Sequence, residues 1–506
     1  MELKKDISNP NVFSIAEGVV YDLPEAPLRA PELAPVPAST FGWTLVNGLA
    51  EAEVNTAWAA DQPAAATEFS FDLGDGISVS GTFGKVSIYD GGPQGLQGSG
   101  RYLYIAMPLT KGVVTRSGAS ETVSPGTFVV QAPLAFSPPI PASAAQTASG
   151  TQHVLGVDWT ETASSPAIID YLYSGTGSLG PVPSALLRAG FGAWLQRAAA
   201  GGQLPKLNSA TVTVNRTFSR FSWLQLVQAS YAYQGSSADA PGILGILGGT
   251  TSPGAFHVLA PDVIPSGSSA GVLIGSQAFV QDVLLPAAAA AFDGASPDDF
   301  ELLNDDTSVS LKSGKTLKLP PATVESGNYD LTVTQFSITL QNQQIVSFVE
   351  ARTEVEPGVT LFVDVTLYNG LELITKADGS RTLNYTVTRT ANASHRIHNS
   401  TGAIIGKVLM SVILTLIFSV SGAVAKTLGE KIMLLILATI IKGAVTAAQN
   451  ILPDLLKNGV KAALPSIDEM IDTLESSVVW AGKSGKSFAP SGARLNESIQ
   501  ISGSFK

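Results

Sequence analysis

The chain has 506 residues, of which 45% are hydrophobic and only 14% are charged. Globular domains usually carry about 25% charged residues, so this chain has few charges to cover its surface. Its 49 Gly and 30 Pro residues fit a chain with many turns and exclude a collagen-like repeat or wholesale disorder. The length suffices for about three ordinary domains, or for fewer large ones, around a large hydrophobic core.

Cysteine content and net charge exclude several classes of function. The chain has no Cys, which excludes disulfides, Cys–zinc sites, iron–sulfur clusters and thiol nucleophiles. A net charge of −11 is the opposite of the basic surface that binds nucleic acid, so we expect no nucleic-acid partner. No apolar run follows Lys4 and Lys5, so we expect no classical signal peptide and synthesis in the cytoplasm.

Residues 1–40 differ from the rest of the chain. Five prolines lie between residues 24 and 37, with no sustained periodicity between them. Such a segment is either an extended arm that lies against the body or a disordered leader. We therefore divide the chain into a Pro-rich N-terminal arm, 1–40, and a body, 41–506.

The first half of the body mixes helical and strand patterns. Helical spacing of apolar residues predicts a helix that begins near Thr40, a short helix around residues 187–195, and a helix over residues 276–293. Pro286 should break or kink the last of these. Alternating apolar and polar residues predict strands at Ile77–Phe83 and Tyr102–Leu109.

Residues 300–395 are the most strand-rich region. Leu361, Val363 and Val365 fall on one face of a predicted strand and Asp364 and Thr366 on the other. The dipeptides at 369–370 (Asn-Gly) and 378–379 (Asp-Gly) predict hairpin turns. Antiparallel strands with one apolar face need an apolar partner to pack against.

The most apolar stretch, residues 403–464, follows directly. Lys407 is its only charge between residues 403 and 425, and residues 401–461 hold six Lys and two acidic residues, a balance of +4. Residues 408–425 approach the roughly 20 apolar residues that span a bilayer. Three interpretations compete: a transmembrane helix or hairpin, a helix buried within a curved sheet, and a helix that covers a lipid-holding cavity. The strands before it favour the two buried interpretations.

Motifs with known chemistry do not combine into an enzyme. Residues 267–271 match G-x-S-x-G, but Pro265 precedes the match and a predicted strand follows it, whereas a nucleophile elbow lies between a strand and a helix. His395 and His398 form an H-x-x-H in what we expect to be a solvated loop, without further ligands nearby in the sequence. We therefore expect no catalytic residue, no metal and no cofactor.

Four blocks of sequence resemble one protein family. The run Phe41-Gly42-Trp43-Thr44-Leu45-Val46, followed by Val54-Asn55, resembles the opening motif of the clostridial OrfX-type accessory proteins, which are encoded beside botulinum neurotoxin genes and in related insecticidal toxin clusters. The other blocks agree in order and spacing: Gly81–Lys85 with Ile88, Gly91-Gly92 and Ile105–Pro108; Pro265–Ala270 with Ile274–Phe279 and Pro286; and Trp480, Phe488 and Ala493–Gly503. The Pro-rich arm and Thr44, where the family usually has Asp, depart from the pattern.

The resemblance implies a tubular lipid-binding (TULIP) fold. This is an elongated α+β fold in which a highly curved antiparallel sheet wraps around a long apolar helix and forms a hydrophobic groove. It agrees with the strands of 300–395, the long apolar helices of 403–464 and the predicted C-terminal strands of 478–505. It also implies a bacterial virulence protein, made in the cytoplasm and released with the toxin.

The predicted groove residues lie on the apolar helix. Lys426 and Lys431 are placed to meet anionic headgroups at one end. Ordinary core packing is the alternative for each apolar residue of the set, which is Ile413, Leu416, Ile417, Val420, Ile436 and Ile440.

The leading hypothesis is a non-enzymatic toxin-cluster accessory protein. Its expected partners are a phospholipid or fatty acid, other toxin-cluster proteins and a membrane surface. The alternatives are a structural assembly partner with a closed core, and a pore-forming protein that inserts residues 403–445 into a membrane as a hairpin.

Overall fold

The structure is a computed structural model. It describes the residue pairs 4–5, 13–14 and 21–22. It also describes residues 37–62, 67–89, 99–141, 150–159, 167–173, 181–218, 220–236, 241–249, 254, 256–304, 306–325, 327–341, 343–400, 407–419, 425–442, 464 and 466–506. Most of the predicted N-terminal arm therefore lies outside the described residues.

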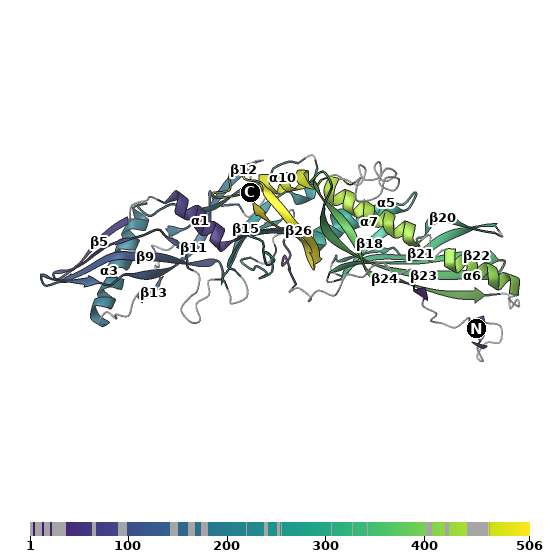
Figure 1. Cartoon of the computed structure of the whole chain (residues 1–506), viewed down its shortest axis with the longest axis horizontal. Coiled ribbons are helices and arrows are strands. Elements are labelled where there is room, and N and C mark those ends of the chain that lie inside the picture. The colour runs from purple at the N-terminus through teal and green to yellow at the C-terminus, as the bar shows by residue number, and fades with distance from the viewer. Residues whose placement is uncertain are drawn as a thin grey trace.

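The described chain is an elongated α+β molecule built mainly of antiparallel sheets (Figure 1). Among the described residues these are sheets of ten, seven and eight strands, together with the pair β1 (Lys4–Lys5) and β2 (Phe13–Ser14). The ten-stranded sheet reaches one end of the molecule, and the eight-stranded sheet reaches the other (Figure 1). The predicted α+β class, with mainly antiparallel sheets and an elongated shape, is confirmed.

The ten-stranded sheet is covered by helix α3 (Pro181–Ala200). Phe191 of this helix stacks on Phe128 at 3.8 Å between ring centroids, inside an aromatic cluster. The predicted helix around 187–195 is thus confirmed. The sheet follows the order β25 (Val478–Trp480), β14 (Asn208–Val214), β12 (Thr151–Val157), β11 (Gly126–Ser137), β9 (Tyr102–Arg116), β6 (Ile77–Phe83) and β5 (Thr67–Gly74), with β7 (Ser87–Ile88) and β10 (Ala119–Val123) on β9 and β13 (Ala167–Tyr173) on β11.

The seven-stranded sheet lies in the middle of the molecule. Its strand β4 (Leu45–Ala50) precedes helix α1 (Glu51–Asp61), so the helix predicted from about Thr40 starts later, after a buried strand. A Cβ on Gly275 would lie 2.5 Å from the Trp43 carbonyl oxygen, so only glycine fits there. The sheet follows the order β26 (Phe488–Asn496), β27 (Ser498–Phe505), β17 (Ala270–Ile274), β4, β16 (Ile243–Gly249), β15 (Gln228–Gln234) and β8 (Ser99–Gly100).

The eight-stranded sheet contains the longest strands. The alternation predicted at 361–366 is confirmed, because Leu361, Val363 and Val365 are buried. The Asn-Gly at 369–370 is not a turn: it lies inside a strand, where the pairing register shifts, whereas Asp378-Gly379 does form a hairpin turn. The order is β18 (Phe300–Leu303), β19 (Ser308–Leu311), β21 (Gly327–Gln341), β22 (Gln344–Glu356), β23 (Val359–Thr375), β24 (Arg381–Asn399) and β3 (Tyr21–Asp22), with β20 (Leu317–Val324) on β21.

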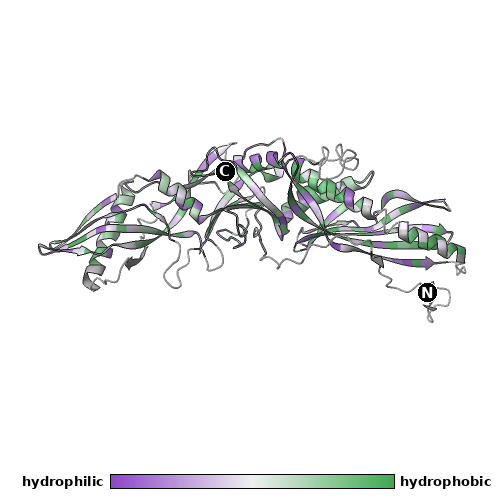
Figure 2. Cartoon of the chain, viewed as in Figure 1, coloured by the Kyte–Doolittle hydropathy of each residue, from purple (hydrophilic) through white to green (hydrophobic). Residues whose placement is uncertain are grey.

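The apolar stretch forms two described helices at this end of the molecule, α6 (Lys407–Ser419) and α7 (Ala425–Lys442). Both are strongly hydrophobic (Figure 2). The described residues of this stretch form these two helices and do not show the single long apolar helix that we predicted. Residues 401–406, 420–424 and 443–463 lie outside the described part.

The remaining helical segments are short. Helix α4 (Ser276–Phe279), the π-helical segment η3 (Val280–Leu284) and helix α5 (Leu285–Ala291) follow one another without a gap. The helix predicted at 276–293 is therefore present, and it is not broken at Pro286, which lies in the first turn of α5. The π turn ends where Pro286 cannot donate a helical hydrogen bond. The others are η2 (Ser222–Leu224), η4 (Pro297–Asp299) and α10 (Asp468–Ser477).

One buried hydrogen bond joins two of the sheets. Trp480 Nε1 of β25 donates to Asn47 Oδ1 of β4 at 3.1 Å, and both residues are buried. Leaving a buried polar group without its partner costs about 1–3 kcal/mol.

We therefore expect Trp480→Phe to lower the free energy of unfolding by about 1–3 kcal/mol, because Asn47 loses its donor. Chemical denaturation measures this change. Val479→Ala, at the exposed neighbouring position, is the matched control and should change stability little. If the hydrogen bond carries the effect, Trp480→Phe should cost much less in an Asn47→Leu background. Equal costs in the two backgrounds would contradict this assignment.

Candidate functional site

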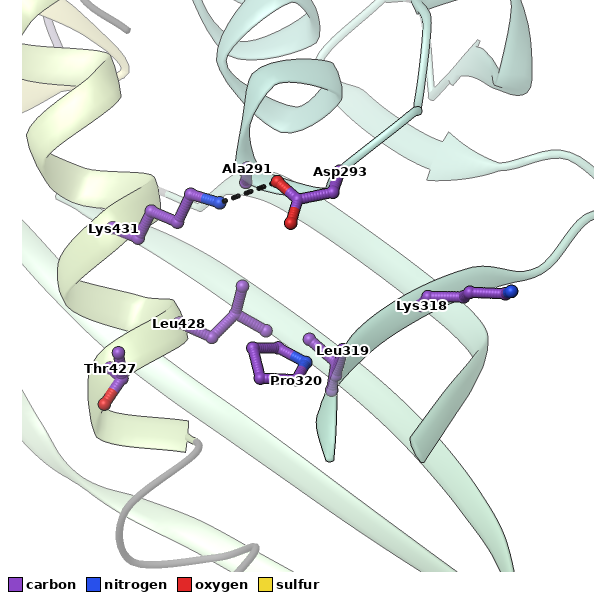
Figure 3. Close-up of a pocket in the computed structure, with 8 residues that line it drawn as sticks. All are labelled: Ala291, Asp293, Lys318, Leu319, Pro320, Thr427, Leu428 and Lys431. Atoms are coloured by element: carbon purple, nitrogen blue, oxygen red, sulfur yellow. Dashed lines mark ion pairs between the residues drawn. The ribbon is translucent and has the colours of Figure 1, made fainter. Parts of the chain in front are cut away.

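A cavity lies where α5, β20 and α7 meet (Figure 3). Its volume is about 200 Å³, and its lining is mostly apolar with charged groups at the edge. Ligand pockets for small molecules are usually about 300–1,000 Å³, so this one is large enough for part of a ligand. The lining residues are Ala291, Asp293, Lys318, Leu319, Pro320, Thr427, Leu428 and Lys431.

The first wall is the end of helix α5. The helix is rich in Ala, which allows close packing against α7, and it ends at Ala291. Phe292 turns inward and is buried, and Asp293 follows with a fully exposed side chain. Gly294 takes a left-handed backbone conformation (φ 78°) that glycine adopts without strain. The chain thus leaves the helix with a carboxylate at the cavity.

The second wall is strand β20. Its pairing with β21 shifts between Leu319 and Ala322, at the sequence Pro320-Pro321. Proline has no N–H to donate to the ladder and is confined to sheet edges and irregularities. The irregularity leaves the half-buried Leu319 and the exposed Pro320 beside α7 (Figure 3).

The third wall is the first part of helix α7. Thr427, Leu428 and Lys431 are placed at i, i+1 and i+4, so they share one side of the helix. Beyond them, residues 432–441 are all buried. The helix therefore combines a pocket wall at one end with a fully packed segment at the other.

The charges at the cavity are loosely paired. Lys431 Nζ lies 3.9 Å from Asp293 Oδ1, which is too far for a hydrogen bond. The Lys318 side chain is exposed and points away from the cavity (Figure 3). Lys431 is therefore the cation placed to meet an anionic group of a ligand in the cavity.

The predicted groove residues are distributed over two clusters. Ile413, Leu416 and Ile417 of α6 are fully buried against the apolar face of the eight-stranded sheet. Ile436 and Ile440 of α7 are fully buried in the larger core.

The cavity lining includes one residue of the predicted set, Lys431. Val420 and the Lys426 side chain lie outside the described residues. Sequence reasoning missed the walls from α5 and β20. The one available signal was the Pro320-Pro321 pair, which marks an irregular strand.

The motifs that we considered for catalysis or metal binding have structural explanations. Gly267 (φ 84°) lies in a turn that leads into strand β17, which agrees with the expected failure of the nucleophile-elbow context. The H-x-x-H lies in strand β24 and not in a loop. His395 is buried opposite Val363, whereas His398 is exposed opposite Thr360. The two rings therefore lie on opposite faces of the sheet and cannot share a metal ion.

Two acidic residues meet on the outer face of the eight-stranded sheet. Glu350 of β22 and Asp364 of β23 are register partners. Glu350 accepts hydrogen bonds from Arg396 and Thr334, and Ser394 Oγ donates to Asp364 Oδ2 at 3.2 Å. Burial raises the pKa of Asp364, and Glu350 adds to the rise.

Two features are absent from the described residues. No helix in that part of the chain has both the length and the hydropathy to cross a membrane. Nor does the same part contain a group of three or more His, Cys, Asp or Glu residues that could hold a metal ion.

Comparison with known proteins gives the family. The model of the OrfX-like family, described as Protein OrfX2/OrfX3/P47, matches residues 40–503. This chain belongs to the OrfX-like family. The family is associated with toxin gene clusters. Protein OrfX3 of Paraclostridium bifermentans is 24% identical over 301 residues, which is 56% of this chain and 59% of OrfX3. The aligned part is therefore less than two thirds of that OrfX-like relative.

Two solved structures share the fold. P47 from Clostridium botulinum A2 matches with a TM-score of 0.59 and 16% identity, over 92% of this chain and 98% of P47. P47 of Clostridium botulinum E1 matches with a TM-score of 0.56 and 15% identity, over 92% of this chain and 100% of P47. At these identities the likeness establishes the fold of this OrfX-like chain, including its curled half-barrel sheet.

The pair Glu350–Asp364 predicts a pH effect on stability. Because the pKa of Asp364 is raised by burial, the folded chain holds its proton more tightly than the unfolded chain, and stability falls as pH rises through the raised pKa. We expect Asp364→Asn to raise the free energy of unfolding at pH 7 by on the order of 1 kcal/mol and to flatten its pH dependence.

Denaturation at pH 4 and pH 7 measures this effect. Asp330→Asn, at an exposed position of strand β21 in the same sheet, is the matched control. A destabilised Asp364→Asn variant at pH 7 would contradict the assignment.

Proposed function

We propose that this chain is a non-enzymatic toxin-cluster accessory protein that binds a lipid or other apolar ligand. The observation that carries the proposal is the cavity between α5, β20 and α7, which has an apolar lining and Lys431 at its edge. This combination of an apolar wall and a few placed polar groups is typical of ligand sites. Membership of the OrfX-like family supports the toxin-cluster part.

The size of the cavity limits what it holds. A volume of about 200 Å³ accommodates a short apolar segment and not a whole phospholipid. Each buried methylene contributes about 0.8 kcal/mol, so a segment of several methylenes supplies a useful binding energy. The cavity as it stands would bind one end of a lipid or fatty acid, with the rest outside.

A longer ligand would involve the residues behind the cavity. Ile436 and Ile440 lie farther along α7, and Ile413, Leu416 and Ile417 lie on the buried face of α6. All five are fully buried in packed clusters. The acyl chain of a ligand could reach them only if α6 or α7 moved away from the sheet, as in a TULIP-like groove that opens on binding. We therefore propose them, with Val420 and Lys426, as an inner groove that a bound ligand would open.

Assembly with other toxin-cluster proteins is the second part of the proposal. Family membership supports it. A bacterial virulence role, release with the toxin and activity on insects belong to the same proposal, and they rest on what the sequence resemblance implies. Co-purification with proteins encoded in the same cluster would test the assembly, and a chain that remains alone in their presence would contradict it.

We do not propose the pore-forming hairpin over 403–445. Residues 432–441 of α7 are all buried within the protein, and α7 packs with α5, α10, β23 and β24. Their apolar character is explained by the core that they fill, so it gives no separate support for insertion into a membrane.

The first test is mass spectrometry of an organic extract of the detergent-free protein. We expect a phospholipid or fatty acid at a stoichiometric level, because the cavity is apolar and open to one end of such a molecule. An empty extract, combined with no uptake from vesicles of phosphatidylcholine and phosphatidylserine, would overturn the lipid part of the proposal.

Thr427→Trp should block the cavity. Thr427 is exposed and lines the opening, so a large ring there fills the space without entering the core. We expect uptake of a fluorescent fatty acid to fall at least about 5-fold with the fold intact by circular dichroism. Val408→Trp, at an 81% exposed position of α6, is the matched control and should bind normally. Unchanged uptake by Thr427→Trp would remove this cavity from the site.

A further inference from the structure

The ion pair at the cavity is unusually loose. Lys431 Nζ and Asp293 Oδ1 are 3.9 Å apart, whereas a hydrogen-bonded ammonium and carboxylate lie about 2.7–2.9 Å apart. The Asp293 side chain is 100% exposed and that of Lys431 is 26% exposed. Exposed pairs of this kind contribute little to stability. Lys431 is therefore a partly buried cation, and an anion closer to its Nζ could replace Asp293 as its partner.

The position of Asp293 does not suit a structural role. It follows directly after the end of helix α5, where the carbonyl groups give the helix terminus a partial negative charge. An acidic residue there is electrostatically unfavourable for the helix. Asp293 is thus placed at the cavity against the preference of its own helix.

Asp299, six residues later, shows the opposite case. Its carboxylate accepts hydrogen bonds from the Ser296 backbone N–H and from Lys315 Nζ, at 2.9 and 2.8 Å. These bonds lower the pKa of Asp299 to about 2. The same short segment therefore contains one carboxylate fixed by strong contacts and one, Asp293, held only by a long contact to Lys431.

We propose that the cavity selects amphiphiles with a single anionic headgroup, and that Asp293 is an internal counter-ion which the headgroup displaces from Lys431. This inference rests on the proposed function and specifies its ligand class. The headgroup would bind Lys431 at hydrogen-bond distance, and the first methylenes would lie on Ala291, Leu319 and Leu428. A neutral amphiphile gains only the apolar contacts, and a cationic one is repelled by Lys431.

Carboxylates and phosphates share this chemistry. A fatty acid and the phosphate end of a lipid would both satisfy Lys431, so the ligand class is the anionic headgroup and not one molecule. Lys318 also lines the cavity, but its ammonium points away from it (Figure 3). It is therefore a matched control for Lys431: the same charge on the neighbouring wall, without the proposed contact.

The test uses the full chain and four probes with the same ten-carbon tail: decanoate, decyl phosphate, decanol and decyltrimethylammonium. Binding is measured by isothermal titration calorimetry below the micelle concentration of each probe. We expect decanoate and decyl phosphate to bind at least about 10-fold more tightly than decanol. Asp293→Asn should tighten both anionic probes about 2- to 5-fold and leave decanol unchanged, because it removes the competing carboxylate.

The variants separate this inference from the proposed function. Lys431→Gln should abolish the preference for anionic probes while decanol still binds, and Lys318→Gln should keep the preference. Equal binding of all four probes, unaffected by Asp293→Asn or Lys431→Gln, would overturn the inference but leave apolar binding intact. If neither the wild-type protein nor the Asp293→Asn variant binds any of the four probes, both the inference and the proposed lipid-binding function are overturned. Tighter binding of decyl phosphate than of decanoate would assign a phosphate source, and the reverse order a fatty acid.

Discussion

The C-terminal segment holds the three large sheets together. Strand β25 extends the edge of the ten-stranded sheet, and the hairpin β26–β27 forms the edge of the seven-stranded sheet. Strand β26 also packs against β23 of the eight-stranded sheet. The buried hydrogen bond from Trp480 to Asn47 fixes the first two sheets relative to each other across more than 400 residues of sequence. The elongated shape of the molecule depends on these contacts between the last strands and distant parts of the chain.

The candidate site depends on the same arrangement. Helix α7 packs against α10, which directly precedes β25, and also against α5 and the long strands β23 and β24. Residues 432–441 are all buried, so in the structure without ligand the packed core holds this part of the helix in place. Lys431 and Leu428 lie at the start of this fixed segment. The cavity is therefore presented by a rigid element, and a rigid element places binding groups more accurately than a loop.

Local patterns in the sequence predicted several elements correctly. The helical spacing at 187–195 and the alternation at 361–366 identified buried faces, because both patterns reflect burial on one side of a single element. The Asp378-Gly379 turn was also predictable, because Gly379 supplies the left-handed conformation that the turn requires. The family resemblance, based on four short blocks, agreed with the match over residues 40–503.

Local patterns failed where the neighbours decide the outcome. The Asn-Gly at 369–370 is a turn signal, yet the partner strands on both sides keep it extended inside β23. The H-x-x-H looked like a loop because polar residues surround it, although residues 392–399 of its strand are all paired with β23. The cavity combines residues from positions 291–293, 318–320 and 427–431, and no spacing rule brings these together. Of the residues that line the cavity, only Lys431 was in the predicted set. A lysine near one end of an apolar helix suggests an amphiphilic ligand, but it does not show that α5 and β20 form the other walls.

Stability and binding are separated along helix α7, and this affects how any variant of it is to be understood. The side chains of residues 432–441 fill the core, so a substitution at Ile436 or Ile440 creates a void or a clash before it changes a ligand contact. Thr427 and Lys431 keep some contact with solvent, so their side chains can change without disturbing the core. A loss of ligand binding at Thr427 or Lys431 therefore reports on the site, whereas a loss at Ile436 or Ile440 reports first on folding. The apolar character of this stretch, which first suggested a lipid groove, is for the most part the property of a packed core, and the chemistry of ligand selection lies in the few polar residues at its start.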